Sequence, residues 1–216
     1  MSKVKEPFFK RSFDLIFSAL GLVVSFPLWI IISLAIYTED PGPICFAQER
    51  VGKRGRLFRV VKFRTMKYCK NNEYLDIDLE EDPRVTEIGK ILRATALDEL
   101  PQLINILKGD ISFVGPRALP LEIEDEEKSR YGTIEEIPGY YLRSQVYPGL
   151  TGLAQIYAPK DASRRDKFHY DNLYVRNMSF LLDLRLIFRS FWVTFKGKWE
   201  SREKKVLSGW DTNRKR

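Results

Sequence analysis

Residues 92–117, LRATALDELPQLINILKGDISFVGPR, place two adjacent carboxylates, Asp98 and Glu99, just ahead of a proline and a short apolar run. Leucine and isoleucine recur at helical spacing through that run. Gly109 supplies a stop for the helix, and Pro101 is tolerated only in a first helical turn. The pattern predicts a short helix that begins close to Pro101, with both carboxylates at or just before its N-terminus.

A carboxylate pair at the start of a helix has more than one use. The helix dipole favours the ionised carboxylate there, which suits a nucleophile or a metal ligand, whereas a general acid needs the opposite shift. Aspartate ahead of a helix is also a common N-cap. For Asp98 and Glu99, capping, metal binding and catalysis therefore all stay open at this point.

Composition narrows the chemistry. The 216 residues are enough for one domain with a sizeable core, and the net charge of +7 indicates anionic partners such as phosphates, nucleic acid or acidic lipid. Two cysteines, Cys45 and Cys69, without CxxC spacing favour a reduced, cytosolic setting. The single histidine, His169, excludes a zinc cluster built on several histidines. Carboxylates, lysines, arginines and hydroxyls are left as the candidate groups.

An uncharged stretch, residues 15–38, predicts a membrane segment. As a helix rising about 1.5 Å per residue, it reaches across a hydrocarbon core of roughly 30 Å. Pro27 near its centre removes the bond that its N–H would make to the Val23 carbonyl, and so predicts a kink. Ser25 is well placed to satisfy the freed backbone, so we expect the membrane helix to be broken at Ser25 and Pro27.

Basic residues on both flanks bear on how this segment sits in the membrane. Because basic flanks stay on the cytoplasmic side, both ends of the segment prefer the same face. A kinked re-entrant helix meets that demand, whereas a straight span violates it at one end. The alternative is an ordinary transmembrane anchor with a tolerated proline. The flanking cations are Lys3, Lys5, Lys10 and Arg11 before the segment, and Arg50, Lys53, Arg54, Arg56 and Arg59 after it.

The rest of the chain predicts a helix-rich α+β domain. Residues 43–66 predict a β-hairpin around a turn at Gly52 to Gly55. Residues 180–199 mix apolar side chains with cations, which indicates an amphipathic helix lying in the membrane interface; a core helix of a soluble domain is the alternative. We expect one domain over residues 10–200, with the membrane segment at 15–38 and a cytoplasmic body at 39–200. A basic tail at 201–216 follows.

Four cations are candidates for binding a phosphate or diphosphate. Lys62 and Arg64 close the second predicted strand, Arg93 precedes the carboxylate pair, and Arg117 follows a Gly-Pro turn. Scattered solvated cations are the plain alternative for any one of them. Residues 147–156, YPGLTGLAQI, form a glycine-punctuated loop that is suited to approach a ligand with its backbone.

Taken together, these segments resemble the bacterial sugar transferase family, the monotopic polyprenyl-phosphate phosphoglycosyl transferases. The resemblance runs in family order from about residue 10 to residue 198. The matching segments are KRSFDL, DPGPICFAQERVG, GRLFRVVKFRTM, DPRVTEIGKILRATALDELPQLINILKGDISFVGPR, PGLTGLAQI and FHYDNLYVRNMSFLLDLRLIF.

The resemblance implies a fold, a reaction and partners. The fold has a re-entrant helix broken at a Ser-Pro pair. The reaction transfers a sugar-1-phosphate from a UDP-sugar to polyprenyl (undecaprenyl) phosphate at the cytoplasmic face of the inner membrane, releases UMP, and is the first membrane step of glycan assembly. The implied partners are the UDP-sugar, polyprenyl phosphate and membrane lipid, with no nucleic acid; a homodimer stays open.

The resemblance also implies roles for particular residues. Asp98 matches the nucleophile that forms a covalent phospho-sugar intermediate, and Glu99 matches its supporting partner in metal binding or proton transfer. Asp98 and Glu99 are thus the expected ligands of Mg²⁺, the family's cofactor. Arg117 matches the phosphate-contacting arginine of the Gly-Pro-Arg motif.

Two positions depart from the family pattern. Phe26 precedes Pro27 where the family has serine, so Ser25 is displaced by one position, and Ala118 follows Arg117 where proline is common. The chain resembles the family's small form, without the additional N-terminal transmembrane domain. A competing hypothesis is a non-enzymatic basic membrane adaptor, but it gives no reason for a carboxylate pair beside Arg117.

Overall fold

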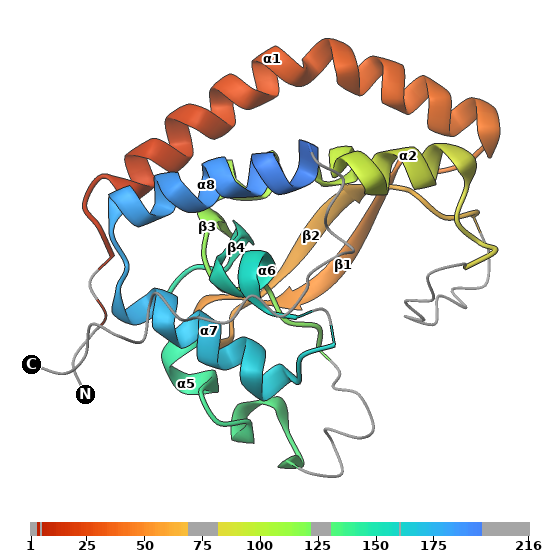
Figure 1. Ribbon diagram of the computed structural model, residues 1–216. Coiled ribbons are helices and arrows are strands. Elements are labelled where there is room, and N and C mark those ends of the chain that lie inside the picture. Colours follow the sequence, from red (N-terminus) through yellow and green to blue (C-terminus); the bar gives the residue numbers. More distant parts are fainter. Residues whose placement is uncertain (1–3, 5, 69–81, 122–130, 160, 196–216) are drawn as a thin grey trace, which may run out of the picture.

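The computed structural model describes residue 4 and residues 6–68, 82–121, 131–159 and 161–195 (Figure 1). It is helix-rich with two small sheets, which confirms the predicted α+β class. Short 3₁₀ turns cover Lys53–Gly55, Leu97–Glu99 and Ile134–Glu136. In chain order the main elements are α1 (Lys10–Glu39), β1 (Cys45–Val51), β2 (Leu57–Phe63), α2 (Glu87–Thr95), α3 (Gln102–Lys108), β3 (Ser112–Val114), α5 (Tyr140–Arg143), β4 (Gly149–Thr151), α6 (Leu153–Tyr157), α7 (Arg164–Arg176) and α8 (Phe180–Phe195).

Helix α1 carries the predicted membrane segment, and it is long and apolar enough to cross a membrane. It runs through Pro27 without interruption, and Figure 1 shows it bent as it arches over α8 and α2. A helix can absorb one missing hydrogen bond as a bend, and α1 continues past Pro27 to Glu39. The hydroxyl of Ser25 accepts a hydrogen bond from the Trp29 indole at 3.1 Å, where we had expected it to bond the freed backbone.

The N-terminal end of α1 is attached to the body by a buried ion pair. Lys10 Nζ lies 2.7 Å from Asp183 Oδ2 on α8, and it also donates to the Val114 carbonyl at 2.8 Å. The Tyr174 hydroxyl donates to the other Asp183 oxygen at 2.6 Å. Lys10 Nζ also donates to the Tyr174 hydroxyl of α7 at 3.2 Å, so one lysine of α1 is bonded to three elements of the body: β3, α7 and α8.

Arg11, the next residue along, binds the end of α3. Its guanidinium donates to the carbonyls of Ile106 and Leu107 at 2.7 and 3.0 Å. These carbonyls belong to the last turn of α3, where helical partners are lacking and a cation is favoured by the dipole. Arg11 thus caps α3.

The C-terminal end of α1 binds the same body. The Glu39 carboxylate accepts hydrogen bonds from the backbone N–H groups of Glu87 and Ile88, at 2.6 and 3.0 Å. These are orphan donors of the first turn of α2, where an anion is stabilised. Asp40 pairs with Arg64 and accepts from the Tyr68 N–H at 2.7 Å. Both ends of the apolar helix are therefore bonded to one body.

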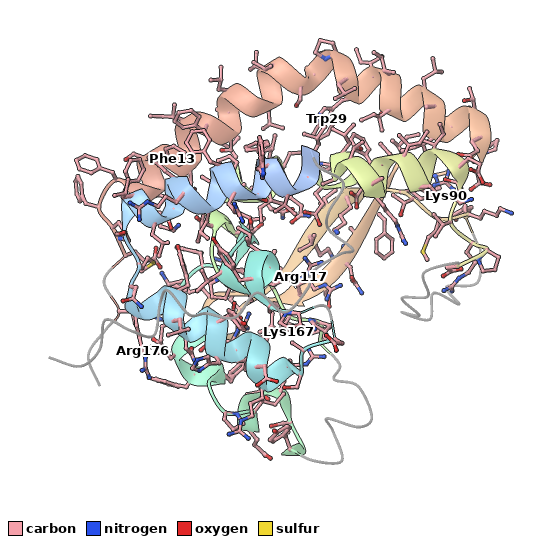
Figure 2. The ribbon with its side chains drawn as sticks, viewed as in Figure 1. Phe13, Trp29, Lys90, Arg117, Lys167 and Arg176 are labelled. Atoms are coloured by element: carbon pink, nitrogen blue, oxygen red, sulfur yellow. The ribbon has the colours of Figure 1, made fainter. Side chains whose placement is uncertain are left out.

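Aromatic and aliphatic side chains pack both halves of α1 onto that body, as Figure 2 shows for Phe13 and Trp29. The Phe13 ring lies 5.4 Å from that of Phe180, centroid to centroid, and the Trp29 ring lies 5.2 Å from that of Phe63. The outer face of α1 is apolar and exposed, at Val23, Val24, Phe26, Ile30 and Ile31 among others.

The predicted β-hairpin is confirmed. Strands β1 and β2 pair antiparallel from Cys45↔Phe63 to Val51↔Leu57, and the turn between them lies at Gly52 to Gly55. Helix α3 packs on β2 through a core cluster that contains Phe58, Val60, Leu103 and Ile106.

A second, parallel sheet of β3 and β4 joins two loops that the sequence singled out. Ser112 pairs with Gly149 and Val114 with Thr151, so the Gly-Pro-Arg turn lies directly against the glycine-punctuated loop. A Cβ on Gly149 would lie 2.0 Å from the Gly115 nitrogen, so this backbone approach requires glycine.

Helix α8 confirms the helix predicted from residue 180; residues 196–199 and the basic tail at 201–216 lie outside the described residues. Leu182 and Leu186 are buried against the body. Phe188, Phe191 and Trp192 are exposed, so α8 has a second apolar face in addition to the buried one. That pattern differs from the polar outer face of an ordinary core helix.

The Lys10–Asp183 pair generates a stability prediction. Lys10→Met or Asp183→Leu alone leaves one charge buried without its partner, and each is expected to cost about 3–5 kcal/mol of unfolding free energy. The double variant removes both charges and should regain most of that loss. The measurement is thermal unfolding in detergent; single losses that simply add in the double variant would show that the two residues act independently.

Candidate active site

The carboxylate pair lies in the connection between α2 and α3. Helix α2 ends at Ala96, which adopts the left-handed conformation at φ 56°, ψ 19°. A 3₁₀ turn, Leu97–Glu99, follows, and Pro101 stands immediately before α3, at its N-cap position. Asp98 and Glu99 therefore sit just before a helix N-terminus, as the sequence predicted, and Gly109 ends α3 with φ 83°.

Two leucines that flank the carboxylate pair hold it next to α1. Leu97 and Leu100 pack against a cluster that includes Ile32 and Ile36 of α1. This contact is apolar and involves side chains on either side of Asp98 and Glu99. The carboxylates are consequently positioned close to the apolar helix by their own neighbours in sequence.

Lys62 lies beside both carboxylates. Its Nζ donates to Glu99 Oε1 at 2.7 Å, and it lies 3.7 Å from Asp98 Oδ2, too far for a hydrogen bond. Lys62 comes from β2, so the site is assembled where the hairpin meets the α2–α3 connection.

The two carboxyl groups have pKa shifts in opposite directions. Burial raises the pKa of Asp98, and the nearby Lys62 only partly offsets that rise. Burial also acts on Glu99, but the charges of Lys62 and Arg117 together lower its pKa below the usual range. The shift at Asp98 runs against the one expected from a helix start, because burial outweighs the favourable charges there.

Two of the arginines singled out in the sequence act on the carboxylate pair. The charge of Arg93 stabilises ionised Asp98, and that of Arg117 stabilises ionised Glu99. The Arg93 Nε donates to the Thr65 hydroxyl at 3.0 Å, which fixes its orientation. Lys62, Arg93 and Arg117 therefore place positive charge around one pair of carboxylates.

Arg64, the fourth predicted cation, has a different partner. It is buried, and its guanidinium binds the carboxylate and the carbonyl of Asp40 at the end of α1. The described contacts of Arg64 thus hold the end of the apolar helix α1, and they do not bring Arg64 to Asp98 or Glu99.

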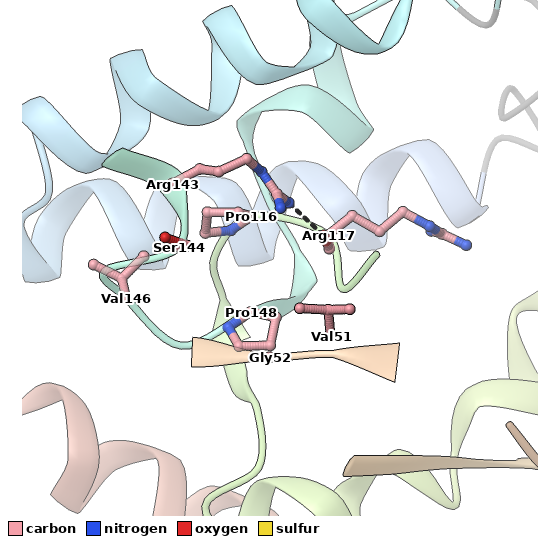
Figure 3. A pocket seen from close by; sticks show the side chains of 8 residues that line it. All are labelled: Val51, Gly52, Pro116, Arg117, Arg143, Ser144, Val146 and Pro148. Carbon is pink, nitrogen blue, oxygen red and sulfur yellow. Dashed lines mark hydrogen bonds between the residues drawn. The ribbon is translucent and has the colours of Figure 1, made fainter. Parts of the chain in front are cut away.

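Sequence reasoning missed Arg143, which holds the Gly-Pro-Arg turn. Figure 3 shows its guanidinium aimed at the backbone carbonyl of Arg117, while the Arg117 side chain extends away from Arg143. The Arg143 Nε also donates to Asp171 Oδ2 at 2.8 Å, and both side chains are buried. A lone arginine ahead of the glycine-rich loop carries no signal in sequence, because Asp171 comes from α7 and is brought to it only by the fold.

The carboxylate pair has the donor chemistry that Mg²⁺ uses. In the part of the chain that the structure describes, no group of three or more His, Cys, Asp or Glu side chains could hold a metal ion. Mg²⁺ is commonly bound by one or two carboxylates, with the remaining positions filled by substrate phosphates and water. Asp98 and Glu99 fit that mode of binding.

Comparisons with known proteins give matches that cover most of the chain. Residues 5–197 match a family model described as "Bacterial sugar transferase". A UDP-glucose:undecaprenyl-phosphate glucose-1-phosphate transferase of Klebsiella pneumoniae is 41% identical over 194 residues, covering 88% of this chain and 40% of that protein. A UDP-N-acetylgalactosamine-undecaprenyl-phosphate N-acetylgalactosaminephosphotransferase of Aeromonas hydrophila is 38% identical, covering 85% and 43%.

A shorter relative is matched over most of its length. The exopolysaccharide production protein ExoY of Sinorhizobium fredii is 37% identical over 196 residues, covering 84% of this chain and 83% of that protein. The chain therefore spans about two fifths of the first two relatives and most of the third.

Replacing Lys62 by Met is expected to raise the pKa of both Asp98 and Glu99, because the ammonium stabilises both ionised carboxylates. The measurement is a pH titration of the carboxyl carbon-13 chemical shifts in metal-free protein in detergent. Lys90→Met, on the exposed surface of α2, is the control and should leave both titrations in place. Unchanged pKa values of both carboxyl groups in Lys62→Met would show that the Lys62 ammonium does not stabilise their ionised forms.

Proposed function

The chain belongs to the bacterial sugar transferase family, and from that premise we propose that it transfers a sugar-1-phosphate from a UDP-sugar to undecaprenyl phosphate or a similar polyprenyl phosphate. The products are UMP and a polyprenyl-diphospho-sugar, which starts glycan assembly at the membrane. The names of the Klebsiella and Aeromonas relatives support this general reaction. The observation that carries the proposal is the position of Asp98 and Glu99, which lie beside Lys62 and are held against an apolar helix.

The charge around the carboxylate pair suits two anionic substrates. A carboxylate approaching a diphosphate meets like-charge repulsion, which must be neutralised before the reacting atoms can meet. Lys62, Arg93 and Arg117 supply positive charge at that point. The contact of Leu97 and Leu100 with α1 supports an acceptor whose phosphate lies at a membrane surface.

In the first step, an oxygen of Asp98 attacks the phosphorus that carries the sugar. The bond between Asp98 and phosphorus forms, the bond from phosphorus to the bridging oxygen breaks, and UMP leaves with that oxygen. One feature favours Asp98 over Glu99 as nucleophile. Lys62 donates its hydrogen bond to Glu99, while its ammonium stays 3.7 Å from Asp98 Oδ2, so that bond does not occupy the Asp98 oxygens.

In the second step, a phosphate oxygen of the polyprenyl phosphate attacks the same phosphorus. The bond to Asp98 breaks, so the carboxylate is restored and the sugar-1-phosphate is on the lipid. Glu99 holds the Lys62 ammonium in place through both steps. Mg²⁺, when bound by the carboxylate pair and the substrate phosphates, supplies further neutralisation of the phosphoryl oxygens.

We infer that α1 is re-entrant: it enters the inner membrane from the cytoplasmic face and leaves through the same face, so both of its ends are cytoplasmic. Attachment of both ends to one body supports this topology, because Lys10 and Glu39 lie at opposite ends of α1. The basic residues on both flanks agree with it. The exposed Phe188, Phe191 and Trp192 support an interfacial position for α8.

Incubation with a panel of UDP-sugars, Mg²⁺ and undecaprenyl phosphate is expected to release UMP with at least one sugar. Asp98→Asn removes the nucleophile and should lower that release by about 10³-fold or more, while the protein stays folded and membrane-bound. Asp166→Asn, at the exposed start of α7, is the control and should retain the wild-type rate. Absence of UMP across the panel would count against the reaction, and a near-normal rate for Asp98→Asn would remove Asp98 as nucleophile.

A further inference from the structure

Asn105 is a buried amide in α3 that neither charge nor spacing marks as functional. Its Oδ1 accepts a hydrogen bond from the Val61 N–H at 3.1 Å. Its Nδ2 donates to the Arg59 carbonyl at 2.7 Å and to Asp110 Oδ2 at 3.1 Å. The amide is thus bonded on both sides, and two of its bonds are to the backbone of β2.

The two hydrogen bonds between Asn105 and β2 lie on the edge of β2 that does not pair with β1. In the sheet of β1 and β2, β1 pairs with one edge of β2, and the backbone groups of residues two apart face the same edge. Arg59 and Val61 are two apart, so the Asn105 amide supplies one donor and one acceptor where a neighbouring strand would. This pattern fixes where α3 lies along β2.

The same register sets the geometry of the site. Lys62 follows Val61 in β2, and it shares a face with Phe58 and Val60, which pack in the core cluster with α3. The carboxylate pair lies just ahead of α3. A shift of α3 along the strand would therefore change the distance from the Lys62 Nζ to Glu99, now 2.7 Å.

Apolar contacts alone do not define such a register, because hydrophobic packing is non-directional whereas hydrogen bonds depend steeply on distance and angle. We propose that Asn105 is a positioning residue, which holds the Lys62 ammonium in contact with Asp98 and Glu99 by pinning α3 to the edge of β2. The catalytic part of this inference rests on the proposed transferase function. The geometric part stands on the contacts of Asn105 alone.

The geometric part is tested by the structure of Asn105→Ala. We expect the contact between Lys62 Nζ and Glu99 Oε1 to open beyond the roughly 4 Å limit of an ion pair. Ile106→Val, a neighbouring position of α3 in the same core cluster, is the control for lost packing and should keep the contact. Retention of the 2.7 Å contact in Asn105→Ala would overturn the proposal. If Asn105→Ala does not fold, Asn105→Ser serves the same comparison.

The catalytic part is tested by a double-mutant cycle on UMP release. Asn105→Ala alone should lower kcat about 10–100-fold, as expected when a catalytic group is misplaced by about 1 Å. If Asn105 acts through Lys62, the double variant Asn105→Ala/Lys62→Met loses no more than Lys62→Met alone. Losses that multiply in the double variant would show a merely structural effect and overturn the role. If the wild-type protein releases no UMP, the proposed function fails, while the distance measurement still decides the geometric part.

Discussion

The structure depends on a constraint at the two ends of its apolar helix. Glu39 caps the first turn of α2, and Arg11 caps the last turn of α3. These are the outer ends of the two helices that flank Asp98 and Glu99. The helix expected to enter the membrane thus bonds to both α2 and α3, the helices on either side of the carboxylate pair. Lys10 bonds the same helix to β3, α7 and α8.

This arrangement explains how the site combines burial with charge. Leu97 and Leu100, on either side of the carboxylate pair, pack against a cluster that includes residues of α1. Burial raises the pKa of Asp98. Lys62 donates a hydrogen bond to Glu99, and its positive charge offsets the negative charge of that carboxylate. The carboxylates have similar chemistry but opposite pKa shifts, so their surroundings already distinguish Asp98 from Glu99.

Features set by neighbouring residues could be predicted from the sequence. Pro101 and Gly109 mark the start and stop of α3, and the Gly52 to Gly55 turn marks the hairpin, because local backbone chemistry decides each of them. The apolar length of α1 and the mixed pattern of α8 are likewise local properties.

Features set by distant partners could not be predicted in this way. The pairing of Arg64, one of the cations predicted to bind phosphate, with Asp40 at the end of α1 is such a feature. The pairs Lys10–Asp183 and Arg143–Asp171 and the contact of Asn105 with β2 join residues that only the tertiary fold brings together. The resemblance to a family supplied roles for Asp98 and Glu99; the contacts of Arg143 and Asn105 come from the structure.

The most direct test of this account is the membrane topology of α1. The native Cys45 is exposed just after the helix, and Phe8→Cys would place a second reporter just before it, with Cys69 replaced by serine and each reporter examined alone. The measurement is labelling by an impermeant maleimide in sealed inside-out and right-side-out membrane vesicles. The account predicts that both reporters react in inside-out vesicles and are protected in right-side-out vesicles. Labelling of the two reporters from opposite faces would contradict it.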